Sequence, residues 1–166
     1  MWKLIYPLFI LIRITGFILI FIEPPWGWLI AYLADLWDYY PAIRFGLSRG
    51  SYLKIDKTLD LIFRLVLFAY AYINSWHVLF LFLILILYRS IGDLLFIITK
   101  QDRYYIYFPN FIDFYFPIFY VLFTYFPYRD SIVDLLLILA ASILKLAHEN
   151  QLHKPGVNDP TTFTTT

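Results

Sequence analysis

The sequence predicts an all-α, polytopic integral membrane protein with six transmembrane helices, and three observations lead to this fold class. Of its 166 residues, 61% are hydrophobic, 22% are aromatic and only 15% are charged, a balance far from that of a soluble domain. Six apolar runs divide the chain, and a helix of about 20 residues can cross a hydrocarbon core of roughly 30 Å. The basic residues outside the centres of those runs lie almost entirely on one side of the predicted membrane.

The first two predicted spans are Leu4–Ile22 and Trp26–Tyr40. The first could be mistaken for a signal peptide, but Arg13 interrupts it and no small-residue cleavage pattern follows it, so we expect an uncleaved membrane anchor. The second is short and begins directly after Pro24 and Pro25. A short span fits a place where the bilayer thins or where one helix end lies in the interface.

The last four predicted spans are Asp56–Ile73, His77–Thr99, Phe111–Phe126 and Ser131–His148. Pro117 predicts a kink in the fifth span, and Ser131 with Asp134 forms a capping-box pattern at the start of the sixth. We therefore expect residues 1–148 to form one six-helix membrane domain. Residues 149–166 are polar and contain two prolines, so we expect a disordered cytoplasmic tail.

The basic residues predict the orientation, because Lys and Arg are retained on the cytoplasmic side of short loops. One side of the predicted membrane carries Lys3, Arg44, Arg49, Lys54, Lys57, Lys100, Arg103, Lys145 and Lys154. The opposite side carries Arg129. We therefore expect both termini to be cytoplasmic in a cell inner or plasma membrane.

Composition also excludes several classes of function. The net charge of +1 gives no support for a nucleic-acid partner, which would need a basic surface. The chain has no cysteine, so disulfides, thiol nucleophiles and thiolate metal sites are excluded. Its three histidines lie at predicted span ends or in the tail, so a metal site would depend on oxygen ligands.

Four aspartates are the main functional signal. Asp35 and Asp38 lie three residues apart near the cytoplasmic end of the second span, and Asp56 and Asp60 lie four residues apart at the start of the third. Each pair therefore shares one helix face at the same predicted depth. Ionisable side chains in a span are costly unless they are paired or bind an ion. Four carboxylates would repel one another, so we expect Mg²⁺ or Mn²⁺ to neutralise them.

Basic residues accompany this acidic site. Arg44, Arg49 and Lys54 lie in the segment between the two aspartate pairs and are candidates to bind a substrate phosphate. Arg13 and Arg89 lie inside predicted spans and are candidates to contact a lipid phosphate. A metal site beneath a basic segment suggests phosphoryl chemistry.

Structural alternatives to these roles remain open at this point. Asp35 and Asp38 could simply pair with Arg44 or Lys54 where the helix meets water, and Asp56 could be an N-cap. The spacing also allows i,i+4 ion pairs between Asp60 and Arg64 and between Arg89 and Asp93. Arg13 could instead direct its guanidinium to the interface.

The aspartate spacing resembles the signature of the CDP-alcohol phosphotransferases, membrane enzymes of phospholipid head-group synthesis. Their pattern is Asp-x2-Asp-Gly-x2-Ala-Arg-x8-Gly-x3-Asp-x3-Asp, and all four aspartates and Ala42 match it. Arg13 is similar to an arginine common in the first helix of that family. Three positions depart from the pattern, because Tyr39 and Tyr52 replace the two glycines and Ile43 replaces the arginine, with Arg44 one position later. Tyrosines at these glycine positions would block or remodel the nucleotide pocket.

The resemblance implies transfer of a phosphatidyl-type group from a CDP-linked lipid to an alcohol, with release of CMP. By the same resemblance, Asp35, Asp38 and Asp56 would bind Mg²⁺ or Mn²⁺, Asp60 would be the general base and Arg44 would contact a phosphate. The expected partners are membrane lipids, the CDP-linked lipid and the acceptor alcohol, with a second copy in a homodimer as a possible partner. The alternatives are a non-catalytic membrane scaffold or assembly subunit that kept the fold, and a small transporter.

Overall fold

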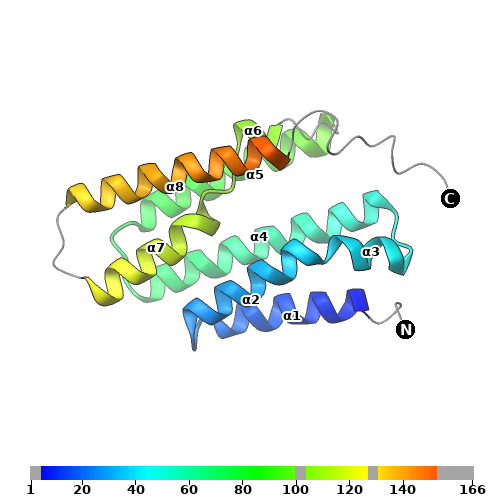
Figure 1. Cartoon of the computed structure of the whole chain (residues 1–166), viewed down its shortest axis with the longest axis horizontal. Helices are drawn as coiled ribbons and strands as arrows, with labels where there is room; N and C mark the ends of the chain where they lie inside the picture. The colour runs from blue at the N-terminus through cyan, green and yellow to red at the C-terminus, as the bar shows by residue number, and fades with distance from the viewer. Residues whose placement is uncertain (1–4, 100–103, 127–130, 153–166) are drawn as a thin grey trace.

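The computed structural model describes residues 5–99, 104–126 and 131–152, and within them every regular element is an α-helix. The helices are α1 (Ile5–Leu19), α2 (Pro24–Trp37), α3 (Tyr39–Phe45), α4 (Arg49–Ile73), α5 (Leu79–Thr99), α6 (Tyr104–Tyr107), α7 (Ile112–Tyr125) and α8 (Ser131–Leu152). In Figure 1, α4 lies between the α1–α2 pair and α8. The all-α fold class is thus confirmed for the described residues.

Helices α1 and α2 form a hairpin in which the two backbones touch. A Cβ atom added to Gly27 would lie 2.3 Å from the backbone nitrogen of Ile20, and one added to Gly16 would lie 2.7 Å from that of Ala31. Distances this short are possible only without a side chain, so both positions require glycine. The hairpin places Arg13, one turn before Gly16, opposite the end of α2 that carries the first aspartate pair.

The segment between the aspartate pairs is largely helical, which the sequence analysis did not predict. The second span was predicted to end at Tyr40, but α2 ends at Trp37 and α3 follows. Gly46 ends α3 in a left-handed conformation with φ of 91°, which glycine adopts without strain. Ser48 then caps α4 by accepting a hydrogen bond from the Ser51 amide at 3.2 Å. Because α4 begins at Arg49, Asp56 lies inside the helix and the N-cap alternative is wrong.

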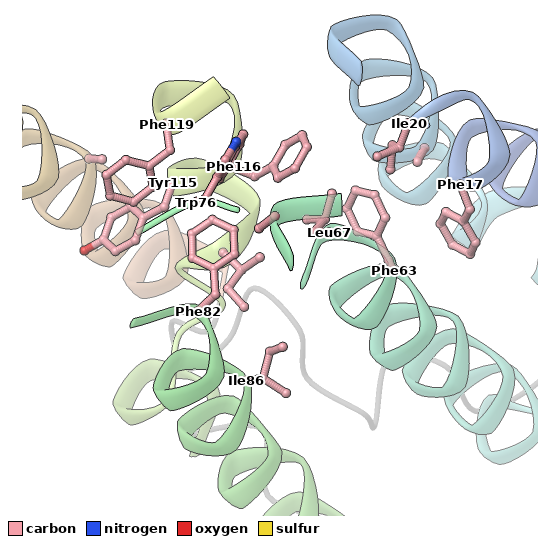
Figure 2. Packing of buried hydrophobic residues seen from close by; sticks show 14 of the residues in the cluster. Phe17, Ile20, Phe63, Leu67, Trp76, Phe82, Ile86, Tyr115, Phe116 and Phe119 are labelled. Carbon is pink, nitrogen blue, oxygen red and sulfur yellow. The ribbon is translucent and has the colours of Figure 1, made fainter. Parts of the chain in front are cut away.

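Aromatic residues form much of the hydrophobic core that holds the helices together. Figure 2 shows Trp76, Phe82, Phe116 and Phe119 gathered where α4, α5 and α7 meet, with Leu67 beside them. The ring centroids of Trp76 and Phe116 lie 5.5 Å apart. On the other side of α4, the Phe17 ring of α1 stacks on Phe63 at 5.3 Å. This contact sets α1 against the face of α4 that carries the second aspartate pair.

The remaining helices agree closely with the predicted spans. Pro117 lies inside α7, whose ends are within one residue of the predicted fifth span, Phe111–Phe126. Helix α8 begins at Ser131 as predicted, although the Ser131 side chain is outside the described residues. It continues to Leu152, so residues 149–152, which we assigned to the tail, are helical. The tail from 153 onward also lies outside the described residues.

Two stretches of the described chain are long and apolar enough to cross a membrane, Leu79–Thr99 and Tyr104–Tyr125. Ile5–Leu19 is a shorter apolar helix. Along α5, one face exposes large apolar side chains in a continuous stripe: Phe80, Ile84, Leu87, Ile91, Leu94 and Ile98. These observations support membrane association, while the number of six spans stays a prediction.

Candidate functional site

The aspartates singled out in the sequence come together in the structure. Asp35 and Asp38 lie at the end of α2, and Asp56 and Asp60 lie on α4; we call these four residues the aspartate cluster. Asp35, Asp38 and Asp56 each offer a carboxylate oxygen, and these three oxygens lie within 4.8 Å of one another. Such a trio of oxygen ligands could hold a metal ion.

Arg13 of α1 contacts every member of the aspartate cluster. Its Nη1 lies 3.0 Å from Asp38 Oδ2 and 3.3 Å from Asp56 Oδ1. Its Nη2 lies 2.8 Å from Asp35 Oδ1 and 2.8 Å from Asp60 Oδ1. The Arg13 side chain is only 1% exposed. Arg13 was predicted to contact a lipid phosphate, whereas in the structure its guanidinium forms ion pairs with carboxylates from two other helices.

Lys57 and Tyr52 complete the contacts of the cluster. Lys57 Nζ lies 2.8 Å from Asp56 Oδ2 and 2.9 Å from Asp60 Oδ2. The Tyr52 hydroxyl donates a hydrogen bond of 2.8 Å to Asp38 Oδ1. Both oxygens of Asp38, Asp56 and Asp60 and one oxygen of Asp35 therefore contact a cation or a hydroxyl group of the protein. The side chain of Asp35 is the most exposed of the four, at 37%.

The aspartate cluster and its two cations do not balance in charge. Four carboxylates together with Arg13 and Lys57 carry a formal charge of −2. Burying charges is costly, and close pairing offsets this cost only where the remaining hydrogen-bonding groups are also satisfied. One divalent cation would neutralise the remainder. The sequence pointed to Arg13 as an intramembrane charge, but the pairing of Arg13 and Lys57 with the aspartates was not predicted.

Two of the residues predicted to bind phosphate lie at the surface of the protein, unlike the buried Arg13. Arg44 lies in the last turn of α3 and Lys54 in the second turn of α4, and both side chains are exposed. The Arg49 side chain lies outside the described residues, although its backbone begins α4. The structure therefore places the side chains of Arg44 and Lys54 at the surface, where they are accessible to a charged ligand.

Arg89 belongs to a second buried ion-pair group. Its Nε lies 3.5 Å from Asp93 Oδ1, which confirms the predicted i,i+4 pair, and its Nη1 donates to the Phe108 carbonyl oxygen at 2.7 Å. Its guanidinium lies 4.2 Å from the centre of the Tyr105 ring. Arg64 binds Asp93 at 2.6 Å. The alternative pair of Asp60 with Arg64 is therefore wrong.

Of the tyrosines at the two motif glycine positions, Tyr52 contacts the aspartate cluster and Tyr39 packs against Tyr52. The Tyr39 and Tyr52 rings meet edge to face with centroids 5.5 Å apart, and the Tyr6 ring of α1 lies 6.4 Å from Tyr52. Tyr52 also reaches Asp38 through its hydroxyl. Two tyrosines thus fill space that the glycines of the resembled motif would leave open.

No protein-family model, no curated protein and no solved structure matches this chain.

Proposed function

We propose that this chain is a divergent relative of the CDP-alcohol phosphotransferases that transfers a phosphatidyl-type group from a CDP-linked lipid to an alcohol and releases CMP. The observation that carries the proposal is the convergence of Asp35 and Asp38, at the end of α2, with Asp56 of α4 at the motif spacing. In this proposal the chain crosses a cell inner or plasma membrane six times, with both termini cytoplasmic. A homodimer is compatible with it.

The three carboxylates would hold Mg²⁺ or Mn²⁺, because both ions prefer oxygen ligands. The cluster charge of −2 fits such an ion. A bound ion would supply Lewis-acid stabilisation of the diphosphate oxygens. The surface residues Arg44 and Lys54 would attract the phosphates of the lipid donor. Asp60 would accept the proton of the attacking hydroxyl group.

The contacts of Asp60 set a condition on that last role. Both of its oxygens face cations, Arg13 at 2.8 Å and Lys57 at 2.9 Å. Neighbouring cations favour the charged carboxylate and make it a weaker proton acceptor. Asp60 therefore needs one of the two cations to move before it can act as a base.

A non-catalytic membrane scaffold is the second candidate, and a specific observation favours it. The protein's own groups already contact both oxygens of three of the four aspartates, and Tyr52 occupies a motif glycine position. In this alternative the aspartate cluster ties α1, α2 and α4 together without binding a ligand.

One assay separates the two candidates. Membranes containing the protein receive a radiolabelled CDP-linked lipid, Mn²⁺ and a panel of alcohols such as glycerol phosphate, serine and inositol phosphate. The enzyme proposal predicts release of CMP and formation of a new lipid, both abolished in Asp38→Asn. The matched control is Asp134→Asn, on α8. Absence of CMP release across the panel, without binding of the CDP-linked lipid, would favour the scaffold.

A further inference from the structure

We infer that Arg13 is a resident counter-ion of the aspartate cluster, and that a divalent cation binds there by displacing part of its guanidinium group. This inference rests on the cation site of the proposed function and adds a competitor built into the chain. Arg13 would then set how tightly the site holds a cation.

The geometry places Arg13 and a cation in competition for the same carboxylates. Asp35, Asp38 and Asp56 make up the trio that could hold an ion, and each already contacts an Nη atom of Arg13. The second oxygens of Asp38 and Asp56 contact Tyr52 and Lys57. An ion coordinated by this trio must therefore replace contacts that the protein now makes with its own groups.

The two ends of the guanidinium are held unequally. Nη2 lies 2.8 Å from both of its carboxylate oxygens, while Nη1 lies 3.0 and 3.3 Å from those of Asp38 and Asp56. The Nη1 contacts are thus the longer ones, and they involve two members of the trio. We expect an ion to displace Nη1 while Nη2 keeps its contacts with Asp35 and Asp60.

The Nε atom of Arg13 makes no hydrogen bond within the described part of the chain that would fix the guanidinium group in place. Arg13 Nε is buried and has no hydrogen-bond partner among the described residues. A buried donor left without a partner is unfavourable, and no hydrogen bond at Nε has to break if the group shifts. Among the described residues, the side-chain contacts of Arg13 to polar groups are those with the four carboxylates of the aspartate cluster.

The charge of the cluster predicts the direction in which cation affinity changes when Arg13 is replaced. With Arg13 in place the cluster carries −2, and without the arginine charge it carries −3. A unit positive charge within a few ångströms of the ligand oxygens weakens the attraction of a second cation, and more strongly inside a protein than in water. Removing that charge should therefore strengthen cation binding, provided that the fold persists.

The test measures Mn²⁺ binding to purified protein in detergent, from the loss of the electron paramagnetic resonance signal of free Mn²⁺. We expect Arg13→Gln to bind Mn²⁺ at least tenfold more tightly than wild type. The matched control is Lys54→Gln, which removes a positive charge from an exposed side chain on α4 and should change the affinity less than twofold. Equal or weaker binding by folded Arg13→Gln would overturn the inference.

Direct occupancy is tested by adding back the missing group. Guanidinium chloride at millimolar concentration should weaken Mn²⁺ binding by Arg13→Gln, whereas tetramethylammonium chloride at the same ionic strength should not. If Arg13→Gln does not fold without metal, Arg13→Lys provides the test, because one ammonium cannot reach all four carboxylates. We expect Arg13→Lys to bind at least threefold more tightly than wild type, and unchanged affinity would again overturn the inference.

These outcomes are separable from those of the CMP assay. Tighter Mn²⁺ binding by Arg13→Gln in a protein that releases no CMP would leave the counter-ion role intact and remove the enzymatic proposal. CMP release by wild type, with no gain in Mn²⁺ affinity in Arg13→Gln, would do the reverse.

Discussion

Asp38 shows how strongly a single residue depends on distant parts of the chain. Its carboxylate is 1% exposed, and it is bonded to Arg13 of α1 and to Tyr52 of α4. Burial of a carboxylate is tolerated only when its oxygens are hydrogen-bonded. Tyr52, one of the two tyrosines that depart from the resembled motif, is therefore one of the two groups that satisfy this buried charge.

We predict that Tyr52→Phe lowers the free energy of unfolding by about 1–3 kcal/mol, because Asp38 Oδ1 loses its donor while remaining buried. Tryptophan fluorescence during denaturation in detergent would measure the change. The control is Tyr72→Phe, near the other end of α4, where the side chain is 66% exposed and the change should stay within about 0.5 kcal/mol. Equal stability of the two variants would show that the Tyr52 hydroxyl does not support Asp38.

The sequence predicted which acids converge but not what they contact. Spacing on one helix was enough to place each aspartate pair on one face. The partner of those acids, Arg13, lies 25 residues before Asp38 and 47 before Asp60, and no local pattern connects positions so far apart. Asp60 had an apparent partner in Arg64 at i+4, but contact between helices gave each residue a different partner.

At the level of helices, the α1–α2 hairpin determines where Arg13 lies. Gly16 and Gly27 allow the two backbones to touch, and Ala31 lies in the same contact. Small residues at a helix interface permit such an approach, as they commonly do between membrane helices. The position of the guanidinium thus depends on glycines more than a turn away from the aspartate cluster.

We predict that Gly27→Ala destabilises the protein by about 1–3 kcal/mol or more, since the new methyl group would lie 2.3 Å from the backbone of Ile20 and the helices must move apart. The control is Gly50→Ala in the first turn of α4, where an added Cβ meets nothing within 4 Å and the substitution should be neutral or stabilising by up to about 1 kcal/mol. Thermal unfolding of both variants in detergent measures the difference. Similar melting temperatures would show that α1 and α2 do not pack this closely.

Helix ends were predicted well where apolar residues define them and poorly where they do not. The fifth span and the start of α8 agree with the structure within one residue. The start of α4 was placed seven residues late, because the basic and small residues of its first two turns were taken for a loop. Gly46 and Ser48 are a C-cap and an N-cap signal that could have corrected this.

On the scale of the whole molecule, three arginines are buried while many large apolar side chains face outward. Arg13, Arg64 and Arg89 are all buried, while Phe80 and Ile98 on α5 are 73% and 68% exposed. Such a distribution is costly in water and favourable in lipid, where the outer surface needs no polar groups. We expect the orientation in the bilayer to be set by the basic residues outside the apolar runs.

We predict that a reporter enzyme fused after Thr166 is active only on the cytoplasmic side of the membrane, and that one fused after Gly50 gives the same result. The reason is that Arg44, Arg49, Lys54 and Lys154 lie near these two positions and favour retention on that side. A fusion after Asp130 is the matched control, since six spans place this position on the opposite face. Paired reporters that are active on opposite sides, such as a phosphatase and a fluorescent protein, would measure the location of all three positions.

Two outcomes would contradict this prediction. Cytoplasmic activity at Gly50 and Asp130 alike would contradict the six-span topology, and non-cytoplasmic activity at both Gly50 and Thr166 would reverse the orientation. The reversed orientation would also move the aspartate cluster away from the cytoplasmic face, where the proposed reaction would release its soluble nucleotide product.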